Sequence, residues 1–165
     1  MRVLSIDPGY THLGCLYALA DWRTGDVQVN HTELMNLHHV DAGRTIALKL
    51  LSLIRTHPFF DECDVLLIER QPPGGVGAVV ENCLAIIYHH KTTLVNPTSM
   101  QGHYNMRGLS RTDRKAFSVA FAREAGVPLP TEERAHDIAD AYLILRYWMH
   151  LQKRTVSKYF PSNPT

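Results

Sequence analysis

The feature of the sequence that most constrains the fold is the unbroken aliphatic run Val65-Leu66-Leu67-Ile68, which Asp64 precedes and Glu69 follows. A strand with one solvated face alternates apolar and polar side chains, whereas a run without alternation is typical of a central strand covered by helices on both faces. The run therefore predicts an α/β fold. It also places the carboxylate of Glu69 at the end of a buried strand.

Turn signals and hydrophobic periodicity divide the rest of the chain into one mixed sheet and its helices. Residues 3–6, 12–20 and 27–35 are β-prone runs separated by Pro8-Gly9 and by a turn cluster at 21–26, which predicts a three-stranded antiparallel meander. The remaining segments predict helices over 40–56, 77–90, 110–125 and 131–152, a strand over 92–95, and a polar loop from there to Gly108. We expect a mixed five-stranded sheet flanked by helices, formed by residues 1–156 and followed by a tail at 157–165.

Length and composition fit one soluble domain. With 165 residues, of which 45% are hydrophobic and 20% charged, the chain is neither disordered nor a collagen or coiled coil. The three cysteines, Cys15, Cys63 and Cys83, are far apart and favour a reducing compartment, and no secretory or membrane-spanning apolar segment is visible. We expect an intracellular protein with no membrane partner; viral, cytoplasmic and nuclear locations stay open.

Four acidic residues lie where solubility alone does not explain them. Asp7 follows the first strand at a Pro-Gly break and Glu69 ends the most apolar strand, so both are expected at strand ends, where open α/β sheets bind ligands. Asp137 and Asp140 are three residues apart in the opening turns of the last helix, on the face that also carries apolar side chains. These positions predict carboxylates that point into the interior.

Each acid also has a purely structural explanation. Asp7 can begin a turn, Glu69 can pair with Arg70, and the helical pair can complement the helix dipole. Together, however, buried carboxylates repel one another and are costly unless cations neutralise them. Carboxylate oxygens suit Mg²⁺ or Mn²⁺, and two such ions about 4 Å apart stabilise the attacking and leaving oxygens of a phosphodiester displacement. The acids therefore indicate nuclease chemistry.

Three motifs, in this order, resemble the RuvC family of Holliday junction resolvases: Ile6-Asp7-Pro8-Gly9, Ile68-Glu69-Arg70-Gln71 and His136-Asp137-Ile138-Ala139-Asp140-Ala141. Length, motif order and spacing match the family almost from end to end. Residues 69–75 and the Arg-rich segment before the third helix resemble the viral branch, related to poxvirus resolvases, more than the bacterial enzyme. The resemblance implies an RNase H-like fold, a homodimer, dependence on Mg²⁺ and paired nicking of four-way DNA junctions.

The resemblance also implies residue roles. The four carboxylates would bind two Mg²⁺ ions, for which Mn²⁺ can substitute, with Asp7 between the ions and a metal-activated water as the attacking group. His136 would orient that water or assist proton transfer, or else only cap or support the acidic pair. Lys115 would stabilise transition-state charge, unless it lies on a solvated helix face.

The net charge of +1 hides an asymmetry between the two parts of the chain. Residues 1–100 contain 7 Lys and Arg against 10 Asp and Glu, whereas residues 101–165 contain 10 against 6. The basic segment between Gln101 and Arg123 suits contact with phosphates, and the Pro-Gly loop after Glu69 allows close backbone approach, although a flexible connector would look the same. The predicted DNA-binding residues are Arg70, Gly74, Gly75, Arg107, Arg111, Arg114 and Lys115.

The predicted helix over 77–90 is apolar on more than one stripe. Such breadth indicates that it packs both inward and against a second surface, which makes it a candidate dimer element. A helix buried entirely within the core is the competing explanation. Its apolar residues include Val79, Val80, Cys83, Leu84, Ile86 and Ile87.

Three other functions compete with junction resolution. A broader structure-selective nuclease would act on flaps, branched DNA or RNA-containing duplexes, because the carboxylates define the reaction and not the junction geometry. An actin-like sugar kinase or ATPase also begins with a strand and an Asp-x-Gly turn, but 165 residues leave no room for its second domain. A non-catalytic nucleic-acid-binding module would not need all four acids.

Overall fold

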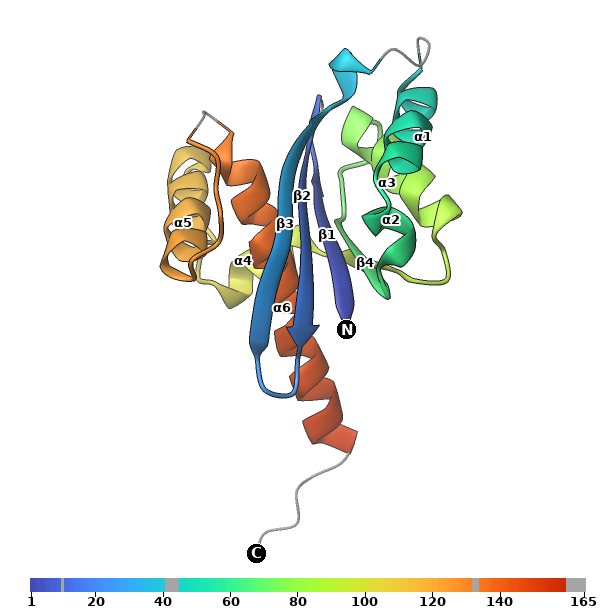
Figure 1. The fold of residues 1–165 in the computed structure, drawn as a ribbon. Helices are drawn as coiled ribbons and strands as arrows, with labels where there is room; N and C mark the ends of the chain where they lie inside the picture. Colours follow the sequence, from blue (N-terminus) through green and yellow to red (C-terminus); the bar gives the residue numbers. More distant parts are fainter. Residues whose placement is uncertain (10, 41–44, 132–133, 160–165) are drawn as a thin grey trace, which may run out of the picture.

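One mixed sheet forms the centre of the molecule. The computed structural model describes residues 1–9, 11–40, 45–131 and 134–159, and within them five strands pair in the order β3-β2-β1-β4-β5 (Figure 1). The first three form an antiparallel meander, and the last two run parallel to β1. The predicted mixed five-stranded sheet is therefore confirmed. The strands are β1 (Arg2–Pro8), β2 (His12–Asp21), β3 (Asp26–Asn36), β4 (Val65–Glu69) and β5 (Thr92–Val95).

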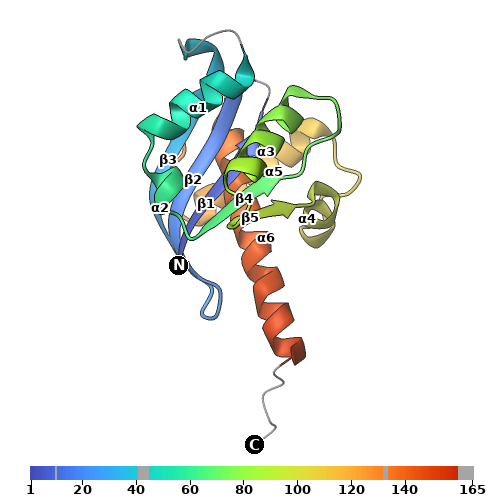
Figure 2. The same ribbon diagram turned by 90° about the vertical axis from the view of Figure 1, so that its right-hand side faces the viewer.

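Helices cover both faces of this sheet. The helices α1 to α3 pack on one face and α4 to α6 on the other, as the two views show (Figures 1 and 2). None of the helices in the described ranges is long and apolar enough to cross a membrane. The helical elements are η1 (Leu37–His39, a 3₁₀ turn), α1 (Ile46–Thr56), α2 (Phe59–Glu62), α3 (Val76–Ile87), α4 (Pro97–His103), α5 (Arg111–Glu124) and α6 (Ala135–Tyr159).

Strand β4 has the double-sided burial that its aliphatic run predicts. Leu66 and Ile68 belong to the core beneath α1 to α3, whereas Leu67 belongs to the core beneath α4 to α6. All three side chains are fully buried. The absence of polar alternation in this strand therefore follows from the absence of a solvated face.

Residues 97–103, which the sequence analysis assigned to a polar loop, form α4. The Asn96 side chain accepts a hydrogen bond from the Ser99 backbone N–H at 3.1 Å, and Pro97 occupies the first turn, so both are ordinary helix-start signals. A helix of seven residues spans only two turns and shows little hydrophobic periodicity. The short elements η1 and α2 were not predicted either.

Helix boundaries also differ from the predicted ones. Helix α6 extends beyond residue 152 and includes Ser157 and Lys158, which were assigned to the tail, because no Gly or Pro interrupts the sequence before Pro161. Helix α1 begins at Ile46, where the Thr45 side chain caps it, and α3 ends at Ile87. The predicted starts of the first and last helices involve residues 41–44 and 132–133, which lie outside the described residues, as do residues 160–165 of the tail.

Helix α6 is fixed to the sheet at two buried points. The Ser5 hydroxyl donates a hydrogen bond of 2.7 Å to the carbonyl of Ala141. At Gly14, an added Cβ would overlap the backbone carbonyl of Asp137 and lie 2.9 Å from the backbone nitrogen of Ile138. Gly14 is the β2 partner of Asp7, so this close approach places the first turn of α6 directly beside Asp7.

Replacing Gly14 by alanine should push α6 off the sheet, because the added methyl meets backbone atoms that cannot rotate away. We expect Gly14→Ala to lower the free energy of unfolding by about 1–3 kcal/mol, the usual cost of overpacking. Urea unfolding followed by circular dichroism measures this change. Gly75→Ala is the matched control, since its Cβ would meet no atom closer than 3.8 Å; equal stabilities of the two variants would contradict the packing argument.

Candidate active site

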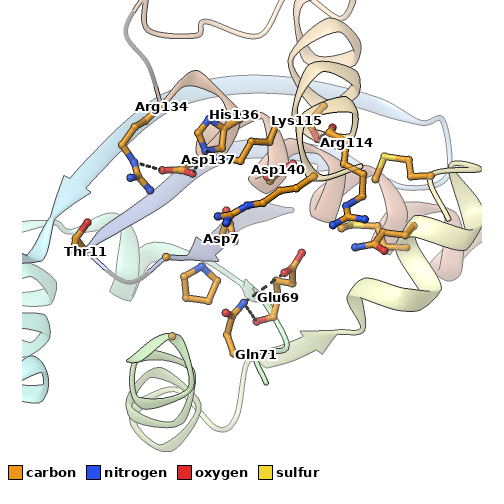
Figure 3. A pocket seen from close by; sticks show the side chains of 18 of the residues that line it. Asp7, Thr11, Glu69, Gln71, Arg114, Lys115, Arg134, His136, Asp137 and Asp140 are labelled. Atoms are coloured by element: carbon orange, nitrogen blue, oxygen red, sulfur yellow. Dashed lines mark hydrogen bonds and ion pairs between the residues drawn. The ribbon is translucent and has the colours of Figure 1, made fainter. Parts of the chain in front are cut away.

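A pocket of about 590 Å³ opens where β1 and β4 end, between α3 on one side and α5 with the first turn of α6 on the other (Figure 3). The structure brings all six predicted catalytic residues together here, from the four elements β1, β4, α5 and α6. Asp7, Glu69, Lys115, His136, Asp137 and Asp140 all line the pocket.

Strand pairing explains how the first two acids meet. Strands β1 and β4 are parallel, and Ile6 pairs with Ile68. The residues that follow, Asp7 and Glu69, therefore lie at adjacent strand ends. The first turns of α6 bring Asp137 and Asp140 to the same place, because Gly14 lets α6 approach the sheet closely.

Burial and mutual repulsion perturb three of these acids. Desolvation, followed by repulsion from Glu69, Asp140 and Asp137, raises the pKa of Asp7 well above its ordinary value. Desolvation, with repulsion from Asp140, raises the pKa of Glu69 to about 7. Desolvation likewise raises the pKa of Asp140 to about 6, although a hydrogen bond from Ser118 opposes the shift. The pocket therefore concentrates carboxylates whose negative charge is poorly compensated.

Asp137 has the charge partners that the other acids lack. Its side chain is buried, Arg134 Nε donates to its Oδ2 at 2.6 Å, and His136 Nε2 lies 2.9 Å from its Oδ1. Figure 3 shows the Arg134 guanidinium reaching this carboxylate from the segment before α6. Sequence analysis did not identify Arg134; its only signal is the three-residue spacing from Asp137, which suits a helical ion pair.

Lys115 and His136 form a contact across the rim of the pocket. Lys115 Nζ lies 2.6 Å from His136 Nε2, and the lysine is partly buried, so it does not lie on a fully solvated helix face. The same Nε2 is the atom near Asp137, so it accepts from Lys115 when unprotonated and donates to Asp137 when protonated. His136 thereby links α5 to the carboxylate cluster.

The predicted DNA-binding residues divide into two groups. Arg111, Arg114 and Lys115 of α5 line the pocket beside the acids. The other four are exposed on the surface and do not line the pocket. Among them, Arg107 Nη2 lies 3.5 Å from the Thr98 carbonyl, and Gly74 adopts a φ of 84°. This second group comprises Arg70, Gly74, Gly75 and Arg107.

Two further polar residues that sequence analysis gave no role contact the acids. Gln71 Nε2 donates to the carbonyl of Glu69 at 3.3 Å and to its Oε1 at 3.5 Å, and an added Cβ at Gly77 would lie 2.6 Å from Gln71 Oε1. Ser118 lies on α5 next to Asp140. The ion pairs among the described residues do not include one between Glu69 and Arg70, so Gln71 takes the place expected for that arginine.

The chemistry of these donors suits a hard divalent cation, although their arrangement is not a finished metal site. Within the described residues, no three His, Cys, Asp or Glu side chains are close enough together to hold an ion. Four carboxylates without a thiolate are nevertheless the donor type that Mg²⁺ and Mn²⁺ prefer. Desolvation and mutual repulsion raise the pKa values of Asp7, Glu69 and Asp140, and a bound cation would oppose both effects.

Comparisons with known proteins identify the fold. No protein-family model matches the sequence, and no curated protein sequence matches it. Among solved structures, the chain is similar to fowlpox virus resolvase in complex with its substrate Holliday junction DNA, with a TM-score of 0.70 and 16% identity over 92% of this chain and 99% of that chain. For Thermus thermophilus RuvC the TM-score is 0.62 and the identity 18%, over 94% of this chain and 98% of that chain. For the yeast mitochondrial Holliday junction resolvase the TM-score is 0.67 and the identity 19%, over 96% of this chain and 84% of that chain.

At these identities the likeness concerns the fold. It extends over almost the whole of this chain and most of each resolvase chain. Together with the five-stranded mixed sheet, it confirms the predicted RNase H-like fold.

Proposed function

We propose that this chain is a metal-dependent endonuclease that resolves four-way DNA junctions by paired symmetric nicking, in recombination or in the processing of replication intermediates. The observation that carries the proposal is the convergence of Asp7, Glu69, Asp137 and Asp140 on one pocket of an RNase H-like fold. Fowlpox virus resolvase and Thermus thermophilus RuvC, which share the fold, were both solved with Holliday junction DNA.

Divalent metal fits the proposal because it supplies the positive charge that the buried acids lack. Bound Mg²⁺ or Mn²⁺, two ions in the complete site, would activate water and stabilise charge on the phosphate. Asp7, Glu69 and Asp140 would hold the metal, and Asp137 would join them in place of its ion pair with Arg134. Released in this way, the Arg134 guanidinium would face the pocket that takes the scissile phosphate.

The remaining pocket residues suit phosphate binding. Arg111, Arg114 and Lys115 place three cations of α5 along one side of the pocket, opposite the strand ends. Such cations bind the non-bridging oxygens of a DNA strand and position it over the carboxylates. Lys115 also contacts His136, so these two residues together would orient the reacting phosphate and its water.

A cleavage panel tests the activity and its substrate range. We expect four-way junctions to be nicked in preference to three-way junctions, flaps and linear duplexes, and only with Mg²⁺ or Mn²⁺ present. Asp7→Asn should reduce the rate about 1000-fold, roughly 4 kcal/mol of transition-state stabilisation, while junction binding persists. Asp26→Asn, an exposed acid of the β2–β3 turn, is the control and should cleave normally.

Two outcomes of the panel would change the assignment. Cleavage retained by Asp7→Asn would remove this pocket from the reaction. Equal cleavage of flaps and four-way junctions would instead favour the broader structure-selective nuclease.

Stability against pH tests the electrostatics of the metal-free pocket. The folded-state pKa values of Asp7, Glu69 and Asp140 are raised above those of the unfolded chain, so the folded state binds more protons between about pH 4 and 7. Their contribution to stability is therefore present below about pH 4 and is lost as pH rises through 6 to 7. In EDTA, Asp140→Asn should remove part of this loss and raise the melting temperature at pH 7.5 by about 5 °C.

Bound metal should raise the melting temperature, as the Asp140→Asn substitution should. Adding Mg²⁺ should raise the melting temperature of the unsubstituted protein mainly above pH 6, where the carboxylates are ionised. Differential scanning calorimetry at several pH values measures both effects. Asp26→Asn should show the same dependence of melting temperature on pH as the unsubstituted protein. If Asp140→Asn also showed that dependence, the electrostatic account would be contradicted.

Paired nicking requires two active sites, and α3 offers a surface for a homodimer. Val80 and Leu84 of α3 pack in the core, whereas Val79 and Ile86 are 43% and 74% exposed, so α3 is not buried entirely in one chain. Helix α1 lies against α3 (Figure 2), and Leu48 of α1 is also exposed. An apolar surface across two adjacent helices suits contact with the same surface of a second copy.

A charge placed on this surface should separate the dimer. We expect Ile86→Glu to shift the protein from dimer to monomer in sedimentation experiments and to reduce paired nicking relative to single nicking. Val156→Glu, at a residue 37% exposed on α6, is the control and should leave the dimer intact. A monomeric unsubstituted protein, or an Ile86→Glu dimer, would exclude this surface as the interface.

A further inference from the structure

The last turns of α6 carry a second concentration of positive charge, far along the helix from the pocket. Its members recur at the spacing i, i+3, i+4, i+7 and i+8, which places them on one helix face. The same five residues line a shallow, open region of the surface. We call this face the cationic stripe: His150, Lys153, Arg154, Ser157 and Lys158.

The cationic stripe belongs to a part of α6 that contributes little to the core. Figures 1 and 2 both show the C-terminal part of α6 extending past the end of the sheet. Lys153, Arg154 and Lys158 are exposed, whereas residues 141–145 of the same helix are buried. The basic side chains are therefore presented to solvent on a projecting helix.

Charges around the cationic stripe leave it positive. No Asp or Glu occurs after Asp140 in the sequence, so every charged side chain of the rest of α6 is basic. Among the described residues, Lys153 and Arg154 have no ion pair with an acid. The neighbouring groups are His103, whose ring centroid lies 4.2 Å from that of His150, and the turn at Gly25, beside Lys153. That turn carries two acids and one cation, Asp21, Asp26 and Arg23, which do not cancel the three cations of the stripe.

Helix-dipole stabilisation explains only part of this pattern. Cations stabilise the C-terminus of a helix, but the effect is confined to about the last turn. Lys158 lies in that turn of α6, whereas Lys153 and Arg154 precede it. Two exposed cations on the same face therefore need another explanation.

We propose that the cationic stripe is a second nucleic-acid-binding site, which holds the phosphate backbone of a duplex outside the carboxylate pocket. The choice of nucleic acid rests on the proposed function, because a branched DNA substrate has arms that extend well beyond the cleaved phosphate. From Asp137 to Lys153 the helix rises about 24 Å, the length of about seven base pairs. Contacts at this distance reach an arm rather than the branch point.

A membrane surface is the less suitable partner for the same charges. Helices that lie on lipid combine a basic face with a broad apolar face rich in Trp, Phe or Leu. Between residues 150 and 158 the exposed apolar side chains are Leu151 and Val156, each only 37% exposed. This segment contains no Trp, Tyr or Phe; Tyr159 and Phe160 follow it in the sequence. The stripe thus has the charge for a polyanion without the apolar face for lipid insertion.

The test compares two double variants that remove equal charge from helices on opposite faces of the sheet. Lys153→Gln/Arg154→Gln removes two cations of the stripe. Lys49→Gln/Arg55→Gln removes two from α1, where Arg55 is exposed and Lys49 is half-buried, with its Nζ 3.5 Å from the His38 carbonyl. Fluorescence anisotropy in EDTA measures binding of a four-way junction with arms of about 20 base pairs over a series of salt concentrations. Circular dichroism melting verifies that both variants are folded.

The salt dependence gives the decisive number. Each lost phosphate contact lowers the slope of log K against log salt by about 0.9, so the stripe variant should lose about 1.8 from its slope and bind about tenfold more weakly near 100 mM salt. The α1 variant should match the unsubstituted protein. At saturating enzyme with Mg²⁺, the stripe variant should cleave the junction at the unsubstituted rate, because the carboxylate pocket is unchanged.

The outcomes separate this proposal from the proposed function. If the unsubstituted protein binds DNA through the stripe but cleaves nothing, the nuclease assignment fails and the stripe stands. If junctions are cleaved while the stripe and α1 variants bind with equal slopes, the stripe proposal is overturned. It is also overturned if the unsubstituted protein does not bind DNA, or if the stripe is needed only for binding vesicles of phosphatidylserine and phosphatidylcholine.

Discussion

The close contact between α6 and the sheet is the constraint on which the candidate site depends. Asp7 and Glu69 are brought together by strand pairing alone, but Asp137 and Asp140 reach them only because the backbone of α6 lies against Gly14. The buried hydrogen bond from Ser5 to Ala141 fixes the helix one turn further along. Gly14 on β2 and the Ser5 hydroxyl on β1 thus determine the position of α6, and with it the position of Asp137 and Asp140.

The approach of α6 to the sheet brings four carboxylates close together, which costs electrostatic free energy. The surrounding residues compensate the charge of one acid more than that of the other three. Asp137, whose backbone lies against Gly14, is held between Arg134 and His136. Asp7, Glu69 and Asp140 have weaker partners, and burial and mutual repulsion raise their pKa values. A fold selected only for stability would replace such acids by apolar residues, because unpaired buried charge destabilises a protein. The cation proposed to bind in this pocket would offset that destabilisation.

Patterns that repeat along the chain could be predicted, whereas contacts between distant segments could not. The aliphatic run of β4 predicted a strand buried on both faces, and periodicity predicted a helix over 110–125, where α5 begins after its Ser110 cap. Helix α4 is too short for periodicity, and the extension of α6 beyond residue 152 has no stop signal to mark it. The roles of Arg134 and Gln71 depend on which acids the fold places beside them, so residue type alone gave no indication of them.

The two ends of α6 explain why net charge is a poor guide to what this chain binds. Its first turns carry the acids of the pocket, and its last turns carry only cations. A total of +1 averages these two environments, although a buried carboxylate and an exposed lysine interact with different molecules. Metal in the pocket would cancel the acidic end, and the exposed surface that remains is basic. One helix therefore carries both the inferred chemistry and the inferred attraction for a polyanionic substrate.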